Sequence, residues 1–398
     1  MTIYFDNAAT SYPKPESVIK GMSDFINRIG ANPGRSGHHL SVEAGNILFK
    51  TREIIAHLFT ISDPLRISFT SNITHSMNIV LFGLLNSGDH VITSSVEHNS
   101  VMRPLRELEK RGVQLTVVKC DKTGMIDPQD IQRSIKSNTK LIVITHASNV
   151  TGTILPIEDI GRITSEHGIL FCIDSAQSAG SIEIDVKKFN IDILCFTGHK
   201  GLFGPMGTGG LYIKSGLEKF IKPFVYGGTG SLSDSENQPD FMPDKYESGT
   251  LNVIGIAGLY EGIKFIRDTG IKNINSKENS LLKRFIDGIS DIKKLTFYGT
   301  DSIYGTDSIE DRIAILSLNI EGFSSSEISL YLDERYGIVT RSGLHCAPSA
   351  HKTIGSFPAG ACRFSFSYFN TDEEIDTAVK ALHEMTLSNS QAKKTMLI

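Results

Sequence analysis

The chain has 398 residues, of which 40% are hydrophobic and 21% charged, an ordinary balance for a folded globular protein. Forty basic and 44 acidic side chains leave a formal charge of −4, which gives no electrostatic reason to expect a nucleic acid or an acidic membrane as partner. No stretch has the roughly 20 apolar residues of a membrane span, and the N-terminus lacks the pattern of a secretory signal.

The cysteines do not suggest a disulfide framework, because their number is odd and their spacing irregular; they are Cys120, Cys172, Cys195, Cys346 and Cys362. The first three lie within or beside apolar, strand-like runs, so we expect them to be buried, reduced thiols. Reduced thiols are typical of a reducing compartment, and we expect a cytoplasmic protein.

Short apolar runs alternate with amphipathic stretches between about residues 45 and 225. A helix is expected at 156–168, where isoleucines recur on one face. Alternation of this kind predicts an α/β fold with an open, mostly parallel sheet, whose ligands bind at the carboxyl ends of the strands. The expected strands are 66–71, 90–95, 115–120, 141–148, 169–176 and 192–199.

The pattern changes after a long Gly-, Ser- and Pro-rich loop at 226–250 and a helix at about 252–268. A strand at 313–320 and a helix at 324–337 follow, and the pair Thr371 and Glu374 forms a capping box for the last helix. We therefore expect a large α/β domain and a smaller α+β domain that contains Cys346. The large domain comprises residues 15–264, and the smaller one comprises 1–14 and 265–398.

Chemistry-bearing side chains lie at or just after the ends of two neighbouring strands at 169–176 and 192–199. Each of these residues alone is weak evidence for a functional site, because an aspartate at a strand end is more often a helix cap and a lysine there is usually just solvated. Together they suit an aldehyde cofactor: Lys200 offers an amine for a Schiff base, and Asp174 offers a carboxylate that keeps a pyridine nitrogen protonated. The residues in question are Asp174, Gln177, Thr197, His199 and Lys200.

Two further turns add to this set. The strand-to-helix turn at 70–76 contains Ile73 and Thr74, and a helix start with a hydroxyl group suits a phosphate. His98 follows the strand at 90–95, where an imidazole can stack on a cofactor ring. These features predict pyridoxal 5′-phosphate as the cofactor.

Cys346 stands in a polar, turn-prone segment, RSGLHCAPSAHK (341–352), where a merely structural cysteine is unusual. We interpret it as a nucleophile, with His345 and Arg341 as candidate groups that stabilise its thiolate. Two other readings are an idle loop residue and a metal site with His345 and His351, although the spacing does not support a metal. Cys362 is expected to be a packed thiol.

Nine ordered blocks of the chain resemble class V aminotransferase-fold enzymes, and most closely the cysteine desulfurase and selenocysteine lyase family. The resemblance covers residues 4 to about 385, and the short RSGLHCA loop is similar to the second desulfurase group. The blocks are DNAAT, NPGRSGHHLS, EHNS, SNVTGT, IDSAQS, FTGHK with GPMGTGGLY, ESGTLN, RSGLHCAP and CRFSFSYFNT.

The resemblance implies the fold of type I pyridoxal-phosphate-dependent transferases and a role for each matching residue. Lys200 would form the Schiff base, Asp174 would pair with the pyridine nitrogen, and Gln177 would bond the phenolic oxygen. His98 would stack on the ring and help to move protons. The remaining cofactor-binding residues would be Ile73, Thr74, Asn149, Thr197, His199 and, from the partner subunit of a homodimer, Thr250.

The implied reaction converts L-cysteine to L-alanine and transfers the sulfur to Cys346 as a persulfide and then to an acceptor protein. Asn149 and Arg363 would orient the substrate, and Arg341 would shape its pocket. The alternatives are a selenocysteine lyase acting on L-selenocysteine, a plain aminotransferase, a C–S β-lyase, and a non-catalytic sulfur-carrier partner. Neither a metal, a nucleic acid nor a membrane is expected.

The chain departs from the family pattern at three places. The phosphate turn has Asn72 to His75 where a Gly-Thr-Thr-Glu pattern is usual, the loop has Leu344 where a histidine is usual, and Leu251 stands where proline is common. No catalytic group is removed by these changes. They leave open the sulfur acceptor and the choice between sulfur and selenium.

Overall fold

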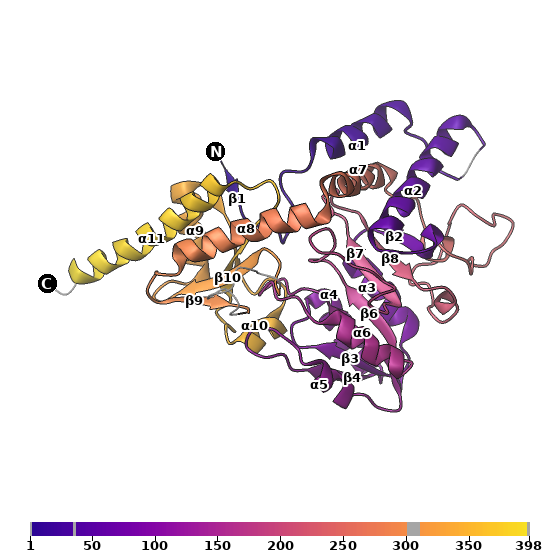
Figure 1. Cartoon of the computed structure of the whole chain (residues 1–398). Coiled ribbons are helices and arrows are strands. Elements are labelled where there is room, and N and C mark those ends of the chain that lie inside the picture. The colour runs from indigo at the N-terminus through magenta and orange to yellow at the C-terminus, as the bar shows by residue number, and fades with distance from the viewer. Residues whose placement is uncertain (1, 35–36, 301–310, 396–398) are drawn as a thin grey trace.

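The computed structural model describes residues 2–34, 37–300 and 311–395, with side chains up to residue 387. In Figure 1 a larger part contains β2 to β8 and a smaller part contains β9, β10, α9 and α11. Helix α8 (Ile271–Ile289) follows α7 (Val253–Thr269) into the smaller part. None of the helices within the described residues is long and apolar enough to cross a membrane.

The larger part is built on a sheet of seven strands among the described residues, in the order β2-β8-β7-β6-β5-β3-β4. Strand β8 runs antiparallel to both neighbours, and the other pairings are parallel. The prediction of an α/β fold with a mostly parallel sheet is therefore confirmed. The strands are β2 (Ile67–Thr70), β3 (His90–Ser94), β4 (Gln114–Val118), β5 (Thr139–Thr145), β6 (Leu170–Asp174), β7 (Ile193–Thr197) and β8 (Gly209–Ile213).

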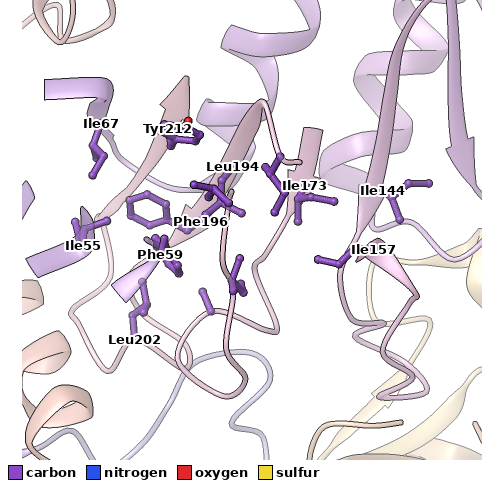
Figure 2. Packing of buried hydrophobic residues seen from close by; sticks show 14 of the residues in the cluster. Ile55, Phe59, Ile67, Ile144, Ile157, Ile173, Leu194, Phe196, Leu202 and Tyr212 are labelled. Carbon is purple, nitrogen blue, oxygen red and sulfur yellow. The ribbon is translucent and has the colours of Figure 1, made fainter. Parts of the chain in front are cut away.

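The central strands are mostly apolar because both faces of the sheet are buried, and their polar residues lie mainly at the ends. Successive side chains of a strand point to opposite faces. Accordingly Phe171, Ile173 and Phe196 belong to one hydrophobic cluster, while Cys172 and Cys195 belong to another. Figure 2 shows the first cluster around Phe196, with Phe59 and Leu202 packed beside it. The prediction that Cys120, Cys172 and Cys195 are buried free thiols is confirmed.

Helices connect and cover these strands (Figure 1). The predicted helix at 156–168 is observed as α6, and the one at 252–268 as α7. The helices of this part are α1 (Glu16–Arg28), α2 (His39–Leu58), α3 (Ile73–Leu84), α4 (Asn99–Lys110), α5 (Pro128–Arg133), α6 (Ile157–Glu166) and α7.

The smaller part contains an antiparallel sheet in the order β12-β13-β10-β9, packed with helices around a separate hydrophobic cluster. Its elements are β9 (Leu295–Tyr298), β10 (Ile315–Ile320), β12 (Arg341–Gly343), β13 (Ala361–Ser365), α8, α9 (Ser325–Tyr336), α10 (Pro348–Ile354) and α11 (Asp372–Thr395). Strand β1 (Ile3–Tyr4) pairs with β11 (Ile338–Val339), so the N-terminal residues lie beside the C-terminal third of the chain. The division at residue 264 stays a prediction; it falls within α7.

A capping box begins each of two helices in the smaller part, and the one predicted at Thr371 and Glu374 is confirmed. Ser324 accepts a hydrogen bond from the backbone of Glu327, whose carboxylate in turn accepts one from the backbone of Ser324. Thr371 and Glu374 form the same reciprocal pair at the start of α11. The β12 strand and α10 flank the segment that contains Cys346, so ordered elements fix both ends of this loop.

Candidate functional site

The candidate site lies at the carboxyl ends of the parallel strands. Asp174 ends β6 and Thr197 ends β7, while His98 and Asn149 follow β3 and β5 by four residues each. Because these ends meet at one edge of the sheet, residues far apart in sequence come together there. Lys200 follows β7 by three residues, and its charge acts on both Asp174 and His98.

Asp174 is buried, and its two carboxylate oxygens have separate partners. Its Oδ1 accepts a hydrogen bond from the backbone N–H of Ala176 at 2.9 Å, and its Oδ2 accepts one from Ser100 Oγ at 3.3 Å. Burial raises the pKa of Asp174, whereas these hydrogen bonds and the charge of Lys200 lower it. The carboxylate is thus held in place and lies within reach of a lysine.

His98 is the N-cap of α4, and this role fixes its tautomer. Its Nδ1 accepts a hydrogen bond from the backbone N–H of Ser100 at 3.0 Å, so in the neutral ring the proton is on Nε2. Burial, and next the charge of Lys200, lowers the pKa of His98 to about 4. The imidazole is therefore neutral at pH 7 and has one N–H group, on Nε2.

Lys200 is held in a form that reacts as a nucleophile. Burial lowers the pKa of its ammonium group to about 8, with Asp174 opposing this effect and Arg363 reinforcing it. In about a tenth of the molecules Lys200 is therefore an uncharged amine at pH 7, a far larger fraction than for an ordinary lysine. An amine in this state can attack an aldehyde.

The N-terminus of α3 offers an anion-binding position next to this cluster. Asn72 caps the helix by accepting a hydrogen bond from the backbone of His75 at 3.0 Å. Ile73 and Thr74 form the first turn, where backbone N–H groups have no partner within the helix, and the side chain of Thr74 is exposed. The buried Nδ1 of His199 has no hydrogen-bond partner among the described residues, so it too can serve a ligand.

Gln177 and Thr197 complete the predicted cofactor set. The Nε2 of Gln177 donates to the carbonyl of Ala8 at 3.1 Å, and the Thr197 side chain is buried 3.5 Å from the carbonyl of Thr208. Thr250 is exposed on the loop before α7, and no contact within the described residues joins it to the cluster. Its predicted role in a partner subunit stays a prediction.

Arg363 is fully buried on β13 and is held by two groups. Its Nη2 forms an ion pair with Asp6 Oδ1 at 2.7 Å, and its Nη1 donates to the backbone carbonyl of Asn149 at 3.0 Å. Its Nε has no partner within the described residues. Burial lowers the pKa of Arg363, but the guanidinium stays charged, because the ordinary pKa of an arginine is near 12.5. The site thus contains an oriented cation that can bind a carboxylate.

The loop of Cys346 is attached to the larger part of the chain by its backbone. The carbonyl of Cys346 accepts a hydrogen bond from the backbone N–H of Asn99 at 2.8 Å, and the carbonyl of His345 accepts one from Asn149 Nδ2 at 2.8 Å. His345 and Cys346 have φ values of 50° and 56°, a left-handed conformation that residues other than glycine rarely adopt. The exposed Cys346 sulfur lies 3.5 Å from Arg341 Nη2.

His345 has no nitrogen available for this thiol. Its Nε2 donates to the backbone carbonyl of Arg341 at 3.0 Å, so its Nδ1 accepts from His351 Nε2 at 3.1 Å, and His351 Nδ1 accepts from Ser356 Oγ at 2.7 Å. Burial lowers the pKa of His345 to about 2 and that of His351 to about 4. Of the two candidate groups, Arg341 is therefore the one in contact with Cys346.

The remaining alternatives for the cysteines can now be compared with the geometry. Cys362 is buried beside Thr340, and burial raises its pKa to about 12, as expected for a packed thiol. No group of three metal-ligating side chains occurs among the residues that the structure describes.

Sequence reasoning missed three residues of the site: Asp6, which holds Arg363; Ser100, which links His98 to Asp174; and His351, which holds His345. Asp6 and Ser100 belong to the DNAAT and EHNS blocks, so their place in those motifs was a usable signal. The sequence suggests His351 only as a metal ligand, whereas its partners in the structure are His345 and Ser356, six and five residues away.

Comparisons with known proteins agree on one family. The family model "Aminotransferase class-V" matches residues 3–378. A probable cysteine desulfurase of Methanothermobacter thermautotrophicus is 36% identical over 389 residues, 96% of this chain and 94% of the relative, and a cysteine desulfurase of Haloferax volcanii is 29% identical, covering 96% and 88%.

Two solved structures are similar over 97% of this chain and 95% of their own length. The apo structure of a cysteine desulfurase from Thermococcus onnurineus has a TM-score of 0.90 at 33% identity. A cysteine desulfurase from Escherichia coli, solved with an S-sulfonic acid, has a TM-score of 0.85 at 27% identity.

Proposed function

The chain belongs to the class-V aminotransferase family, and we propose that it is a pyridoxal-phosphate-dependent cysteine desulfurase. It converts L-cysteine to L-alanine and places the sulfur on Cys346 as a persulfide. The observation that carries this proposal is the exposed Cys346 thiol in contact with Arg341, on a loop that Asn149 ties to the buried Lys200–Asp174 site.

The residues present fit pyridoxal phosphate. Lys200 is an amine with a lowered pKa, Asp174 is a buried carboxylate, and His98 is a neutral ring linked to Asp174 through Ser100. The orphaned Nδ1 of His199 and the N-terminus of α3 suit the phosphate group. When bound, this cofactor supplies an electron sink for the bonds around the Cα of an amino acid.

The residues of the chain have separate roles in this proposal. Lys200 holds the cofactor through its amine, Asp174 keeps a proton on the pyridine nitrogen, and Gln177 donates to the phenolic oxygen. Ile73, Thr74, Thr197, His199 and Asn149 complete the binding site. The Nε2–H of His98 donates a hydrogen bond at the reaction centre, because its Nδ1 already accepts one from the backbone of Ser100.

Arg363 binds the substrate carboxylate, with Asp6 and Asn149 setting its direction. Substrate sulfur then faces the Cys346 thiolate, to which Arg341 donates. The Cys346 sulfur forms an S–S bond while the Cβ–S bond of the substrate breaks. The electron pair of that bond stays on carbon and takes a proton to give alanine, so the step needs no outside oxidant.

The working form is a homodimer in this proposal. The side chain of Thr250 is exposed in its own subunit and would help to bind the cofactor phosphate in the partner subunit. The loop before it is anchored by the buried ion pair between Arg52 and Glu247, at 2.6 Å, which would hold Thr250 in position for such a role. A sulfur acceptor protein and a reducing, cytoplasmic setting complete the proposal, in keeping with five free thiols.

Product analysis of the purified holoprotein tests the function. With L-cysteine and dithiothreitol, we expect alanine and sulfide in equal amounts and no pyruvate. Pyruvate with sulfide would instead indicate a C–S β-lyase, and transfer of the amino group to a keto acid would indicate an aminotransferase. L-selenocysteine, offered in parallel, measures the preference between sulfur and selenium. Absence of alanine with either substrate would contradict the proposal.

A further inference from the structure

An open groove of about 480 Å³ lies beside the Cys346 loop, between α4 and α10. Helix α4 lines one wall and α10 the other, and Figure 1 shows the two helices as neighbours. Asn99, the first residue of α4, lines the groove, and its backbone N–H donates to the carbonyl of Cys346, so one end of the groove adjoins the Cys346 loop. Thr353 of α10 donates to Ser95 Oγ at 2.9 Å and attaches the second wall to the end of β3.

The groove is basic. Arg103, Arg106 and Lys110 follow one another at helical spacing on one face of α4, and Lys352 faces them from α10. All four side chains are exposed. Glu107 is the acidic residue that lines the groove within the described residues, so positive charge prevails here although the whole chain carries −4.

The basic groups can change partners at little cost. Arg106 pairs with Glu109 at 2.9 Å and Lys110 with Glu107 at 3.1 Å, but these are exposed pairs within one helix. Such pairs contribute little to stability, because water screens them. Carboxylates of a partner can therefore replace them and gain the attraction of the whole groove.

We propose that this groove binds an acidic, cysteine-containing segment of the protein that takes sulfur from Cys346; the inference rests on the proposed desulfurase function. Eleven helical steps separate Asn99 from Lys110, which gives the groove a length of roughly 16 Å at about 1.5 Å per residue. An extended segment of about five residues spans that length. Its cysteine lies at the Cys346 end, and its acidic residues lie along α4.

The transfer itself balances without an additional reactant. The thiolate of the bound segment attacks the outer sulfur of the Cys346 persulfide. The S–S bond to Cys346 breaks, an S–S bond to the acceptor cysteine forms, and Cys346 leaves as a thiolate. A nucleic acid would also be attracted to basic side chains, but a thiol-bearing partner explains why the groove adjoins the loop that carries the reactive cysteine.

The test uses three synthetic ten-residue peptides, each with one central cysteine flanked by acidic, neutral amide or lysine residues. The holoprotein is supplied with L-cysteine, and mass spectrometry follows the sulfur that appears on each peptide. We expect the acidic peptide to accept sulfur at least about tenfold faster than the neutral one at low ionic strength, and this advantage to shrink in about 0.5 M salt.

Charge reversal in the groove provides the matched comparison. The double variant Arg106→Glu with Lys352→Glu should prefer the lysine peptide over the acidic one. Lys187→Glu is the control: it reverses the charge of an exposed residue that precedes the amino end of β7. It should keep the wild-type preference for the acidic peptide. Sulfide release with dithiothreitol, which needs no groove, should be equal in all three proteins.

Three outcomes would overturn the inference. If all three peptides accept sulfur at the same rate while turnover with dithiothreitol is normal, the groove proposal is wrong and the proposed desulfurase function is unaffected. A second outcome combines equal sulfur transfer with binding of an oligonucleotide to the wild-type protein and not to the double variant. It would show that the groove binds nucleic acid. If no persulfide forms on Cys346 of the wild-type protein, both the proposed function and this inference are wrong.

Discussion

The Nδ1 atom of His345 lies 3.1 Å from the Nε2 atom of His351, and this contact occupies the one ring nitrogen of His345 that does not bond Arg341. Hydrogen bonds at both ends of the pair, to Arg341 and Ser356, leave each ring with one tautomer. The two histidines therefore hold the loop in its left-handed conformation and are not proton acceptors for the thiol. Arg341 remains the group in contact with the sulfur.

The first prediction concerns His351 as a positioning residue. His351→Ala should lower the desulfurase rate by about 10- to 100-fold, because a shift of the loop by about 1 Å misplaces the Cys346 sulfur. Cofactor binding, seen as the visible absorption band, should not change. His351→Gln can still donate to His345 and should restore part of the rate; equal rates in the Ala and Gln variants would contradict the role.

The second prediction is a loss of stability in acid. The pKa of His345 in the folded chain is about 2, below its ordinary value of 6.5, so as the pH falls below 6.5 the unfolded chain binds a proton that the folded chain does not. Stability is then lost, by up to about 2 kcal/mol at pH 5 for such a group. Melting temperatures of wild type between pH 7 and pH 5 measure the loss. His345→Gln should make this loss smaller without abolishing it, because His98 and His351 also have lowered pKa values, whereas the exposed His39→Gln should leave it unchanged.

The grouping of the candidate site residues could be predicted because the carboxyl ends of parallel strands meet at one edge of the sheet. Strand ends recognised in the sequence place Asp174, Thr197 and Lys200 together, whatever the packing elsewhere. The partners of these residues could not be predicted in the same way. Asp6 reaches Arg363 across 357 positions of sequence, and no local pattern specifies such a pair.

Strand β8 was also missed, for a packing reason. Its start, Gly209 and Gly210, has the composition of a turn, so no strand is predicted there. In the structure, a Cβ on Gly210 would lie 2.5 Å from the ring of Phe196, so the strand can approach β7 because the side chain is absent. Likewise the direction of the His345 ring depends on contacts that residue spacing does not encode.

The third prediction concerns Asp6. Asp6→Ala leaves the buried guanidinium of Arg363 without its ion-pair partner, which should lower the free energy of unfolding by about 1–3 kcal/mol, less than for a fully buried pair because Asp6 is partly exposed. The KM for L-cysteine should rise, because Arg363 loses its direction. Asp6→Asn keeps an acceptor and should have a smaller effect on both; unchanged KM in Asp6→Ala would contradict the assignment.

The fourth prediction concerns the amine of Lys200. Its pKa of about 8 means that uptake of pyridoxal phosphate by cofactor-free protein should accelerate as the pH rises from 6 to about 8 and then level off, because the uncharged amine is the reacting form. Stopped-flow absorbance measures this rate. Lys200→Ala should show no protein-linked visible band at any pH, and a band in that variant would overturn the role of Lys200.

The fifth prediction tests Thr250 and the dimer together. Thr250→Ala should weaken cofactor retention, measured as loss of the visible band during dialysis, with little change in melting temperature, because the side chain is exposed in its own subunit. Sedimentation should show a dimer for wild type and variant alike. A monomer with full activity would contradict the proposed role of a partner subunit.

The sharpest prediction concerns Cys346→Ala. The variant retains Lys200, Asp174 and Arg363, so it should bind cofactor and L-cysteine as the wild type does, with the spectral change that substrate binding produces. Sulfur removal should fall by several orders of magnitude, because no thiolate remains to take the sulfur.

A loop cysteine that merely fills space would behave differently, because a packing change at an exposed position has little effect on rate. L-selenocysteine is the internal control: selenium leaves more readily than sulfur, so selenide release should survive in part. Mass spectrometry of wild-type protein after L-cysteine should find added sulfur on the peptide with Cys346 and not on the one with the buried Cys362. Full cysteine desulfurase activity in Cys346→Ala, with no persulfide on wild-type Cys346, would leave an aminotransferase or β-lyase as the remaining reading.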